Sequence, residues 1–173
     1  MKPILAAIAL TLLAMPAAAA PRLKALAHVI GLDGKPPGSI IFDGTPRGVL
    51  ITFDLAGLAP GPHAIALHVS GNCDTKKGFY TAGPILSLAQ GHRHGYLAKD
   101  GPLTGDLPNQ FAGADGRLHA SVMTGAFTLG NGSKSIFDRD GVSIIVAARG
   151  DDYASQPAGA SGARRKSTCG RVP

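Results

Sequence analysis

The chain has 173 residues and a formal net charge of +6, and all eleven of its acidic residues are aspartate. Glutamate, a good helix former, is absent, while 24 glycines and 13 prolines interrupt the chain, so the composition disfavours a mainly helical fold. The basic residues are scattered except at Arg164, Arg165 and Lys166, and no aromatic residue interleaves with this cluster. We therefore expect no nucleic-acid partner.

The N-terminal segment has the pattern of an export signal. Lys2 is followed by an apolar run over residues 4–15 and by small residues at 16–20. This pattern predicts a secretory signal peptide over residues 1–20, cleaved near Ala19 or Ala20, with an uncleaved anchor as the alternative. The apolar run is short for a bilayer span and no second run follows, so we expect no transmembrane segment after cleavage. The predicted location is periplasmic or secreted, with one domain over residues 21–173.

Short segments that suit β-strands recur along the rest of the chain. In residues 49–55 the alternation is clean, and Val49, Ile51, Phe53 and Leu55 are predicted to face one way. Many short strands between Asp-Gly and Pro-Gly turns favour an antiparallel sandwich or barrel. The predicted strands cover residues 23–30, 39–42, 49–55, 64–69, 110–112, 118–124 and 142–148.

Two long stretches, residues 71–109 and 150–168, do not fit this rhythm and are predicted as loops. Cys73 lies at the start of the first and Cys169 directly follows the second, and these are the only cysteines. In an oxidising compartment such a pair usually forms a disulfide. The bridge would tie down both loops and, in the chain-entropy model, stabilise the fold by about 4 to 5 kcal/mol.

Several short motifs occur along the chain: Gly-Pro-His-Ala-Ile-Ala-Leu-His at 61–68, Thr-Ala-Gly-Pro at 81–84, Gly-Asp-Leu-Pro at 105–108, Ala-Asp-Gly at 114–116, Gly-Asp-Asp at 150–152, Gln-Pro at 156–157 and Cys-Gly at 169–170. Their order and spacing resemble the copper/zinc superoxide dismutase family of the bacterial periplasmic type. The resemblance runs from about residue 23 to residue 172. It implies a Greek-key β-sandwich, or flattened eight-stranded barrel, of immunoglobulin-like form with two long loops and a Cys73–Cys169 bridge.

The copper ligands implied by the resemblance are mostly replaced. The family holds copper with four imidazoles, but Ala66, Ile85 and Ala147 stand at three of those positions and only His68 remains. His63 cannot substitute, because its odd spacing from His68 places it on the opposite face of the strand, where it matches a structural histidine of the family. A single imidazole does not hold copper usefully, so we expect no dismutase activity by the family mechanism.

The zinc side is better preserved. His94 and Asp106 match two zinc ligands, whereas Leu103 stands at the position of a third. By the same resemblance, Asp151 matches the carboxylate that supports histidines of both metal sites. Lys166 stands at the position of the arginine that guides the anion to copper.

Two functions follow from this pattern. The first is an exported binding or structural module, whose partner would be a small ligand or a protein, with haem suggested only by family analogy. The second is a superoxide dismutase or other metalloprotein that binds zinc or copper at a rearranged site made of His68, His92, His94 and Asp106. The sequence leaves open whether the chain forms a homodimer.

Overall fold

The structure, a computed structural model, describes residues 22–137, 141–160 and 163–173. The predicted signal peptide over residues 1–20 lies outside these ranges. None of the described helices has the length and apolar character needed to cross a membrane. The eight strands are β1 (Lys24–Gly31), β2 (Gly38–Thr45), β3 (Gly48–Leu55), β4 (Gly61–His68), β5 (Asp106–Ala112), β6 (Leu118–Thr124), β7 (Val142–Ala147) and β8 (Lys166–Val172), with two short 3-10 helices, η1 (Thr75–Lys77) and η2 (Tyr80–Ala82).

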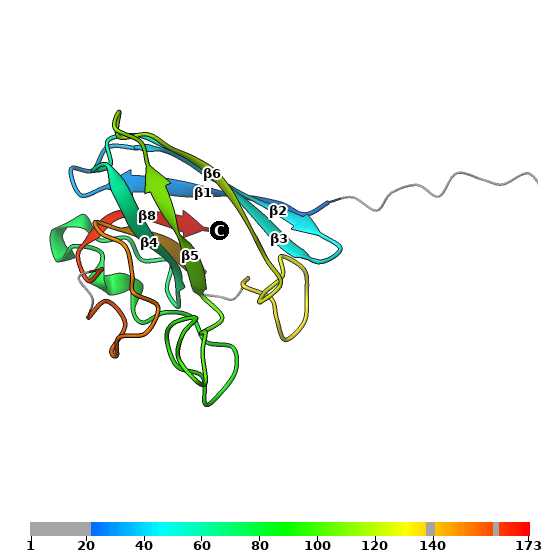
Figure 1. Ribbon diagram of the computed structural model, residues 1–173. Coiled ribbons are helices and arrows are strands. Elements are labelled where there is room, and N and C mark those ends of the chain that lie inside the picture. Colours follow the sequence, from blue (N-terminus) through cyan, green and yellow to red (C-terminus); the bar gives the residue numbers. More distant parts are fainter. Residues whose placement is uncertain (1–21, 138–140, 161–162) are drawn as a thin grey trace, which may run out of the picture.

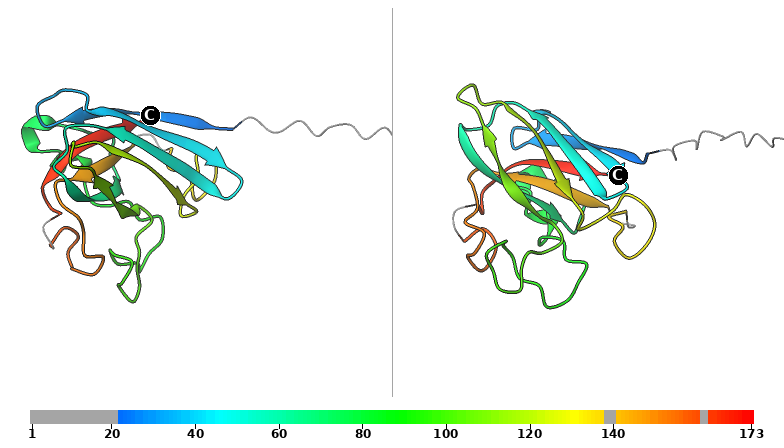
Figure 2. Two further views of the ribbon diagram at one scale, coloured as in Figure 1. Left: turned by 45° about the horizontal axis from the view of Figure 1, so that its top comes forward. Right: turned by 45° about the vertical axis from the view of Figure 1, so that its right-hand side comes forward.

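All eight strands form one antiparallel sheet that curls into a nearly closed barrel (Figures 1 and 2). The strand order is β5-β4-β7-β8-β1-β2-β3-β6, and the two edge strands, β5 and β6, contact each other without ladder hydrogen bonds. Because β7 lies between β4 and β8, and β8 pairs with β1, the chain crosses the barrel ends as a Greek key does. The predicted all-β Greek-key fold is confirmed.

The core follows from the alternation of side chains along the strands. Val49, Ile51, Phe53 and Leu55 of β3 are all buried, as their spacing predicts, while the residues between them are more exposed. The same alternation in β1 buries every second residue from Ala25 to Val29. The barrel interior is therefore lined by apolar side chains from all eight strands.

Several strand limits differ from the sequence prediction, and one strand was not predicted. The Asp43-Gly44 pair is not a turn, because β2 continues to Thr45 in register with β3. β5 begins at Asp106 rather than at residue 110, and Pro108 is tolerated because β5 is an edge strand. β8 begins at Lys166, inside the predicted second loop, because pairing with β1 and β7 on both sides makes it a strand.

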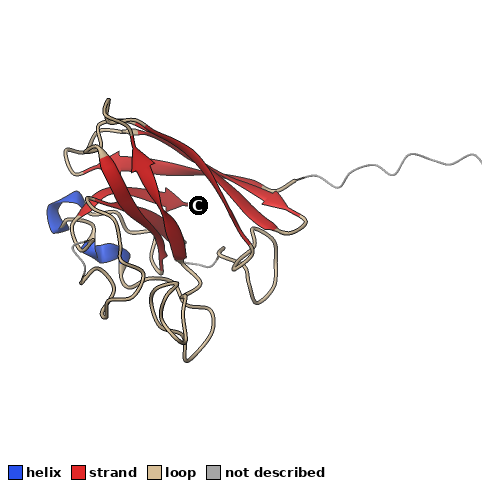
Figure 3. Ribbon diagram, in the orientation of Figure 1, coloured by secondary structure: helices blue, strands red, loops and turns tan. Residues whose placement is uncertain are grey.

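The two long loops lie side by side at one end of the barrel, where Figure 3 shows them as tan segments below the red strands. The predicted disulfide between Cys73 and Cys169 is confirmed, with a Cα–Cα distance of 5.6 Å across a separation of 96 residues. It joins the first loop to β8 and packs with Phe79, Ala82 and Ile145. The bridge thus fixes the first loop against the strand that follows the second loop.

Direct contacts also hold the two loops together. The Leu97 amide donates to the Tyr153 carbonyl at 2.9 Å, and the rings of Tyr96 and Tyr153 pack edge to face at 5.6 Å. Gly95 has a φ of 99°, and a Cβ atom there would collide with the Tyr153 carbonyl, so glycine permits this close approach. The loops therefore form one wall over the end of the barrel.

Candidate functional site

A cavity of about 540 Å³ lies between the outer face of β4 and β7 and the two long loops. All four positions at which the dismutase resemblance expects a histidine and finds an apolar residue line this one cavity. His68, His94 and Asp106 line it as well. The four replaced positions are Ala66, Ile85, Leu103 and Ala147.

Side chains of β4 point alternately to its two faces, and this decides which histidine lines the cavity. Ala66 and His68 share the face that lines it, whereas His63 is buried in the interior with 1% exposure. Both ring nitrogens of His63 contact backbone carbonyls, Nδ1 that of Ala147 and Nε2 that of Ala59, each at 2.7 Å. His63 therefore ties β7 to the turn before β4, consistent with the expected structural role.

His68 is the single imidazole on the copper side of the cavity. Its Nδ1 donates to the Gly83 carbonyl at 2.7 Å, so in the neutral ring the lone pair lies on Nε2. Burial lowers the pKa of His68 to about 4, and the positive charge of Lys166 adds to this effect. His68 is therefore neutral at physiological pH.

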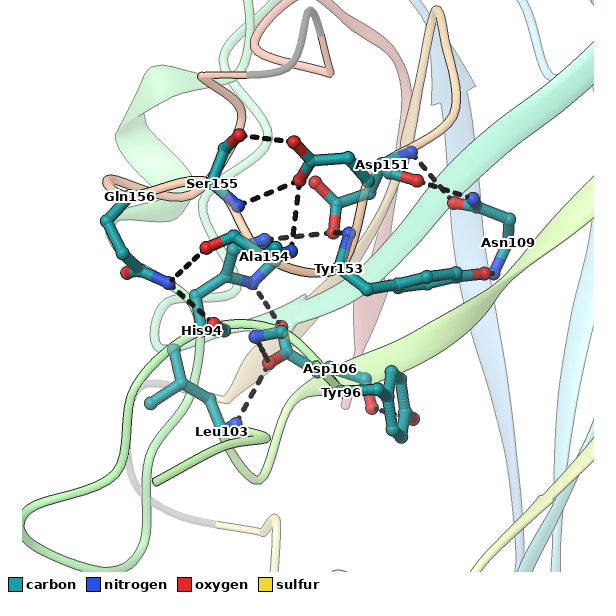
Figure 4. Close-up of polar contacts among 12 residues, drawn as sticks. His94, Tyr96, Leu103, Asp106, Asn109, Asp151, Tyr153, Ala154, Ser155 and Gln156 are labelled. Atoms are coloured by element: carbon teal, nitrogen blue, oxygen red, sulfur yellow. Dashed lines mark hydrogen bonds and ion pairs between the residues drawn. The ribbon is translucent and has the colours of Figure 1, made fainter. Parts of the chain in front are cut away.

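His94, on the zinc side, lies between two carboxylates (Figure 4). Its Nδ1 donates to Oδ1 of Asp106 at 2.8 Å, and its Nε2 lies 3.0 Å from Oδ2 of Asp151. The second contact is an ion pair between two side chains that are both buried. The hydrogen bond to Asp106 raises the pKa of His94 to about 9, with further support from both carboxylate charges against the cost of burial. The ring is thus a cation at neutral pH.

Backbone groups complete the surroundings of Asp106. Its Oδ2 accepts hydrogen bonds from the amides of Gly95 and Leu103, each at 2.9 Å, and its own carbonyl accepts from the Tyr96 hydroxyl at 2.9 Å. Asp106 is 5% exposed, so these bonds and the His94 cation compensate a carboxylate that water barely reaches.

Asp151 is held in a comparable way. The Asn109 side chain brackets its backbone, accepting from the Asp151 amide at 3.0 Å and donating to the Asp151 carbonyl at 2.9 Å. Its Oδ2 also accepts from the Tyr153 amide at 3.0 Å. The second loop therefore aims this carboxylate at His94.

The donors present do not fit a copper or zinc ion of the family type. The two carboxylates contact opposite nitrogens of one ring, so Asp106, His94 and Asp151 do not converge on a common point. Within the described ranges, no group of three or more histidine, cysteine or acidic residues is arranged to hold a metal ion.

The remaining candidates lie at the mouth of the cavity. His92 is exposed, and its Nδ1 lies 3.2 Å from the Pro102 carbonyl. Lys166 is half-buried, donates to the Phe79 carbonyl at 3.0 Å and lies 5.3 Å from the centre of the Tyr80 ring. Two of the four residues of the proposed rearranged metal site, His94 and Asp106, contact each other. His68 and His92 instead form hydrogen bonds with the carbonyls of Gly83 and Pro102. The rearranged site stays a prediction.

Sequence reasoning missed the tyrosines that line the cavity. Tyr80, Tyr96 and Tyr153 all contribute to its wall, and they are the only tyrosines in the chain. Their restriction to the two predicted loops was a signal available in the sequence. Gln156, in the Gln-Pro motif, also lines the cavity and donates to the His94 carbonyl at 2.6 Å.

Comparison with known proteins gives related sequences. The chain is 41% identical over 143 residues to a protein named copper-zinc superoxide dismutase from Caulobacter vibrioides, covering 82% of each. It is 33% identical over 141 residues to superoxide dismutase-like protein YojM from Bacillus subtilis, covering 79% of this chain and 70% of that one.

Solved structures of related proteins have a similar fold. A superoxide dismutase-like protein from Bacillus subtilis matches with a TM-score of 0.79 at 27% identity, covering 86% of this chain and 97% of that one. The copper/zinc superoxide dismutase of Brucella abortus shares the fold, with a TM-score of 0.68 at 23% identity over 87% of this chain and all of that one. A family profile described as copper/zinc superoxide dismutase matches residues 37–172. The chain therefore belongs to the copper/zinc superoxide dismutase family.

Proposed function

We propose that this protein is an exported member of the family that does not catalyse copper-dependent dismutation and acts as a binding module. Its binding site would be the cavity at the position of the family's metal centre. One observation carries the proposal: Ala66, Ile85, Leu103 and Ala147 together line that cavity. Methyl and alkyl groups cannot bind a metal, so four of the donors that the resemblance implies are missing from one place.

The charge balance around His94 supports the same proposal. Two buried carboxylates without a cation would be costly, and in a zinc site the metal supplies the positive charge. Here the imidazolium of His94 contacts both Asp106 and Asp151 and supplies that charge itself. A proton thus serves the structural role of the ion.

The names of the relatives do not decide whether this chain is a dismutase. One relative is named copper-zinc superoxide dismutase and another superoxide dismutase-like protein. Activity in this chain depends on its own donors rather than on those names. The single imidazole on the copper side favours the binding module.

The test combines metal analysis with a superoxide assay on the purified mature protein. After exposure to equimolar copper and zinc and removal of the excess, we expect well below one copper per chain and no faster superoxide decay than buffer. The matched variant restores four histidines, Ala66→His, Ile85→His, Leu103→His and Ala147→His, on the same scaffold. We expect it to gain copper binding relative to the unmodified chain.

One copper per chain with rapid superoxide decay in the unmodified protein would overturn the proposal. That result would favour the rearranged site of His68, His92, His94 and Asp106. Single substitutions of His92 and His94 would then identify the ligands, because replacing a ligand should lower the copper content of the protein. In a metal-free module neither substitution should change the metal content.

Export is a separate part of the proposal. The disulfide between Cys73 and Cys169 is typical of oxidising compartments, which supports it. When the full chain is expressed in a bacterium, we expect the periplasmic fraction to contain a form whose mass corresponds to cleavage after Ala19 or Ala20. An uncleaved product confined to the cytoplasm would contradict export.

A further inference from the structure

The cavity has an aromatic and aliphatic lining with a cationic entrance. Besides the three tyrosines, its wall includes Ile85, Leu103 and Ile145. Its volume of about 540 Å³ lies within the range typical of small-molecule sites, which are mostly apolar with a few placed polar groups. These properties suit an organic molecule better than a bare inorganic ion.

The charges that line the cavity are unequally compensated. Asp106 and Asp151 are its only carboxylates among the described residues, and both contact His94. Lys166, by contrast, makes no ion pair with any described carboxylate, although its side chain is half-buried. A cation in such a place gains from an anionic partner, because the cost of partial desolvation is otherwise uncompensated.

The surroundings of Lys166 define where an anion would bind. The ammonium group donates a hydrogen bond to the Phe79 carbonyl and lies over the Tyr80 ring. Among the described residues it has no other hydrogen-bond acceptor, so further N–H donors are available to a ligand. Arg93 and Arg164 also line the cavity and are exposed at its mouth. The positive field therefore favours entry of an anion on the side of Lys166.

We propose that the cavity binds a planar aromatic carboxylate, with the carboxylate at Lys166 and the ring system between Tyr80 and the apolar wall formed by Ala66, Ile85 and Ala147. This inference rests on the proposed function as a binding module and names its ligand class. A small inorganic anion would leave the apolar wall unfilled, and a neutral aromatic compound would leave Lys166 uncompensated. Stacking on tyrosine distinguishes a planar acid from a fatty acid.

The chain offers a convenient probe of this site. It has no tryptophan, and its three tyrosines all line the cavity, so intrinsic fluorescence reports on this cavity alone. We would titrate the chelator-treated mature protein with 2-naphthoate, following tyrosine quenching and measuring the Kd by calorimetry. The neutral 2-naphthamide tests the charge, and octanoate tests the aromatic ring.

We expect saturable binding of 2-naphthoate with quenching, and about tenfold weaker binding of the amide and of octanoate. Lys166→Met should weaken 2-naphthoate binding about tenfold and remove its advantage over the amide. Lys134→Met removes the same charge from an exposed position that does not line the cavity and should leave the Kd unchanged. Ala66→Phe, which fills the cavity, should abolish binding, and thermal unfolding would check that each variant folds.

Equal affinity for acid and amide, or an unchanged Kd in Lys166→Met, would overturn the proposal, as would octanoate binding as tightly as 2-naphthoate. Metal content measured on the same samples distinguishes failure of the proposed ligand class from failure of the proposed function. Metal-free protein that does not bind 2-naphthoate would refute this inference and leave the absence of dismutation intact. Stoichiometric copper with superoxide decay would refute the proposed function itself.

Discussion

Two of the histidines that line the cavity, His68 and His94, have opposite electrostatic environments. His68, on the copper side, lies among apolar residues near the Lys166 cation, and its pKa falls to about 4. His94, on the zinc side, lies between Asp106 and Asp151, and its pKa rises to about 9. One ring is thus held neutral and the other charged within a single cavity.

The difference shows how burial treats neutral and charged side chains. Neutral imidazole ligands can be exchanged for apolar residues without leaving a buried charge, as at Ala66, Ile85 and Ala147. A buried carboxylate needs a cation, and Asp106 contacts a histidine that can carry a proton. In this cavity the wall near His68 is apolar, whereas the surroundings of His94 are ionic.

Removing the disulfide should cause the largest loss of stability. It should also affect the segment around Gly83 more than the surroundings of Asp106. Cys73→Ala with Cys169→Ala should reduce the free energy of unfolding by about 4 kcal/mol, measured by urea denaturation. Since Cys73 anchors the segment around Gly83, amide exchange of Val69 and Ser70, which donate to that segment, should accelerate. The Gly95 and Leu103 amides, which donate to Asp106, should stay protected; equal acceleration at all four would contradict the separation.

The carboxylate on the zinc side should dominate the stability of that side. Asp106→Asn removes the negative charge that compensates the His94 cation and should cost about 3 kcal/mol in urea denaturation. Asp54→Asn is the matched control, because Asp54 forms an exposed ion pair with Arg117 at 3.2 Å and should cost less than about 1 kcal/mol. Similar losses in the two variants would show that the charge cluster is not structural.

The two pKa shifts predict opposite slopes of stability with pH. The raised pKa of His94 contributes stability that is complete below pH 6.5 and is lost as pH rises towards 9. The lowered pKa of His68 contributes stability that is complete above pH 6.5 and is lost as pH falls towards 4. Thermal unfolding against pH should therefore show a loss on each side, and His94→Asn should flatten only the alkaline one. A variant that flattened the acid side instead would reverse the assignment.

Among the substitutions at the candidate site, His68→Leu should cost the least stability. His68→Leu loses one hydrogen bond to the Gly83 carbonyl and should cost about 1 kcal/mol. His94→Leu should cost more, because it leaves Asp106 and Asp151 without their cation. Urea denaturation of the pair would check the order, and the reverse order would break the comparison.

Much of the fold could be predicted because its signals are local or topological. The alternation in β3, the opposite faces of His63 and His68, and the cysteine pair all follow from spacing along the chain. β8 could not be predicted, since its small and polar residues become a strand only through pairing on both sides. Pro108 similarly obscured the start of β5, because a proline is acceptable there only when the strand is an edge.

The candidate site was predicted as a set of residues but not as a set of interactions. Motif spacing indicated His94, Asp106 and Asp151, yet the hydrogen bond of Nδ1 to Asp106 depends on how two loops pack. The same packing brings Tyr96 and Tyr153 together from positions far apart in the sequence. Such contacts have no local signature.

The most direct test of the account is the protonation of the two rings, read from imidazole ¹⁵N chemical shifts between pH 4 and pH 10. We expect His68 to remain a neutral ring with its proton on Nδ1 down to about pH 5, and His94 to remain doubly protonated up to about pH 8. Addition of equimolar zinc should leave both patterns unchanged. Titration of both rings near pH 6.5, or loss of the His94 Nδ1 proton when zinc is added, would contradict a site held together by a proton in place of a metal.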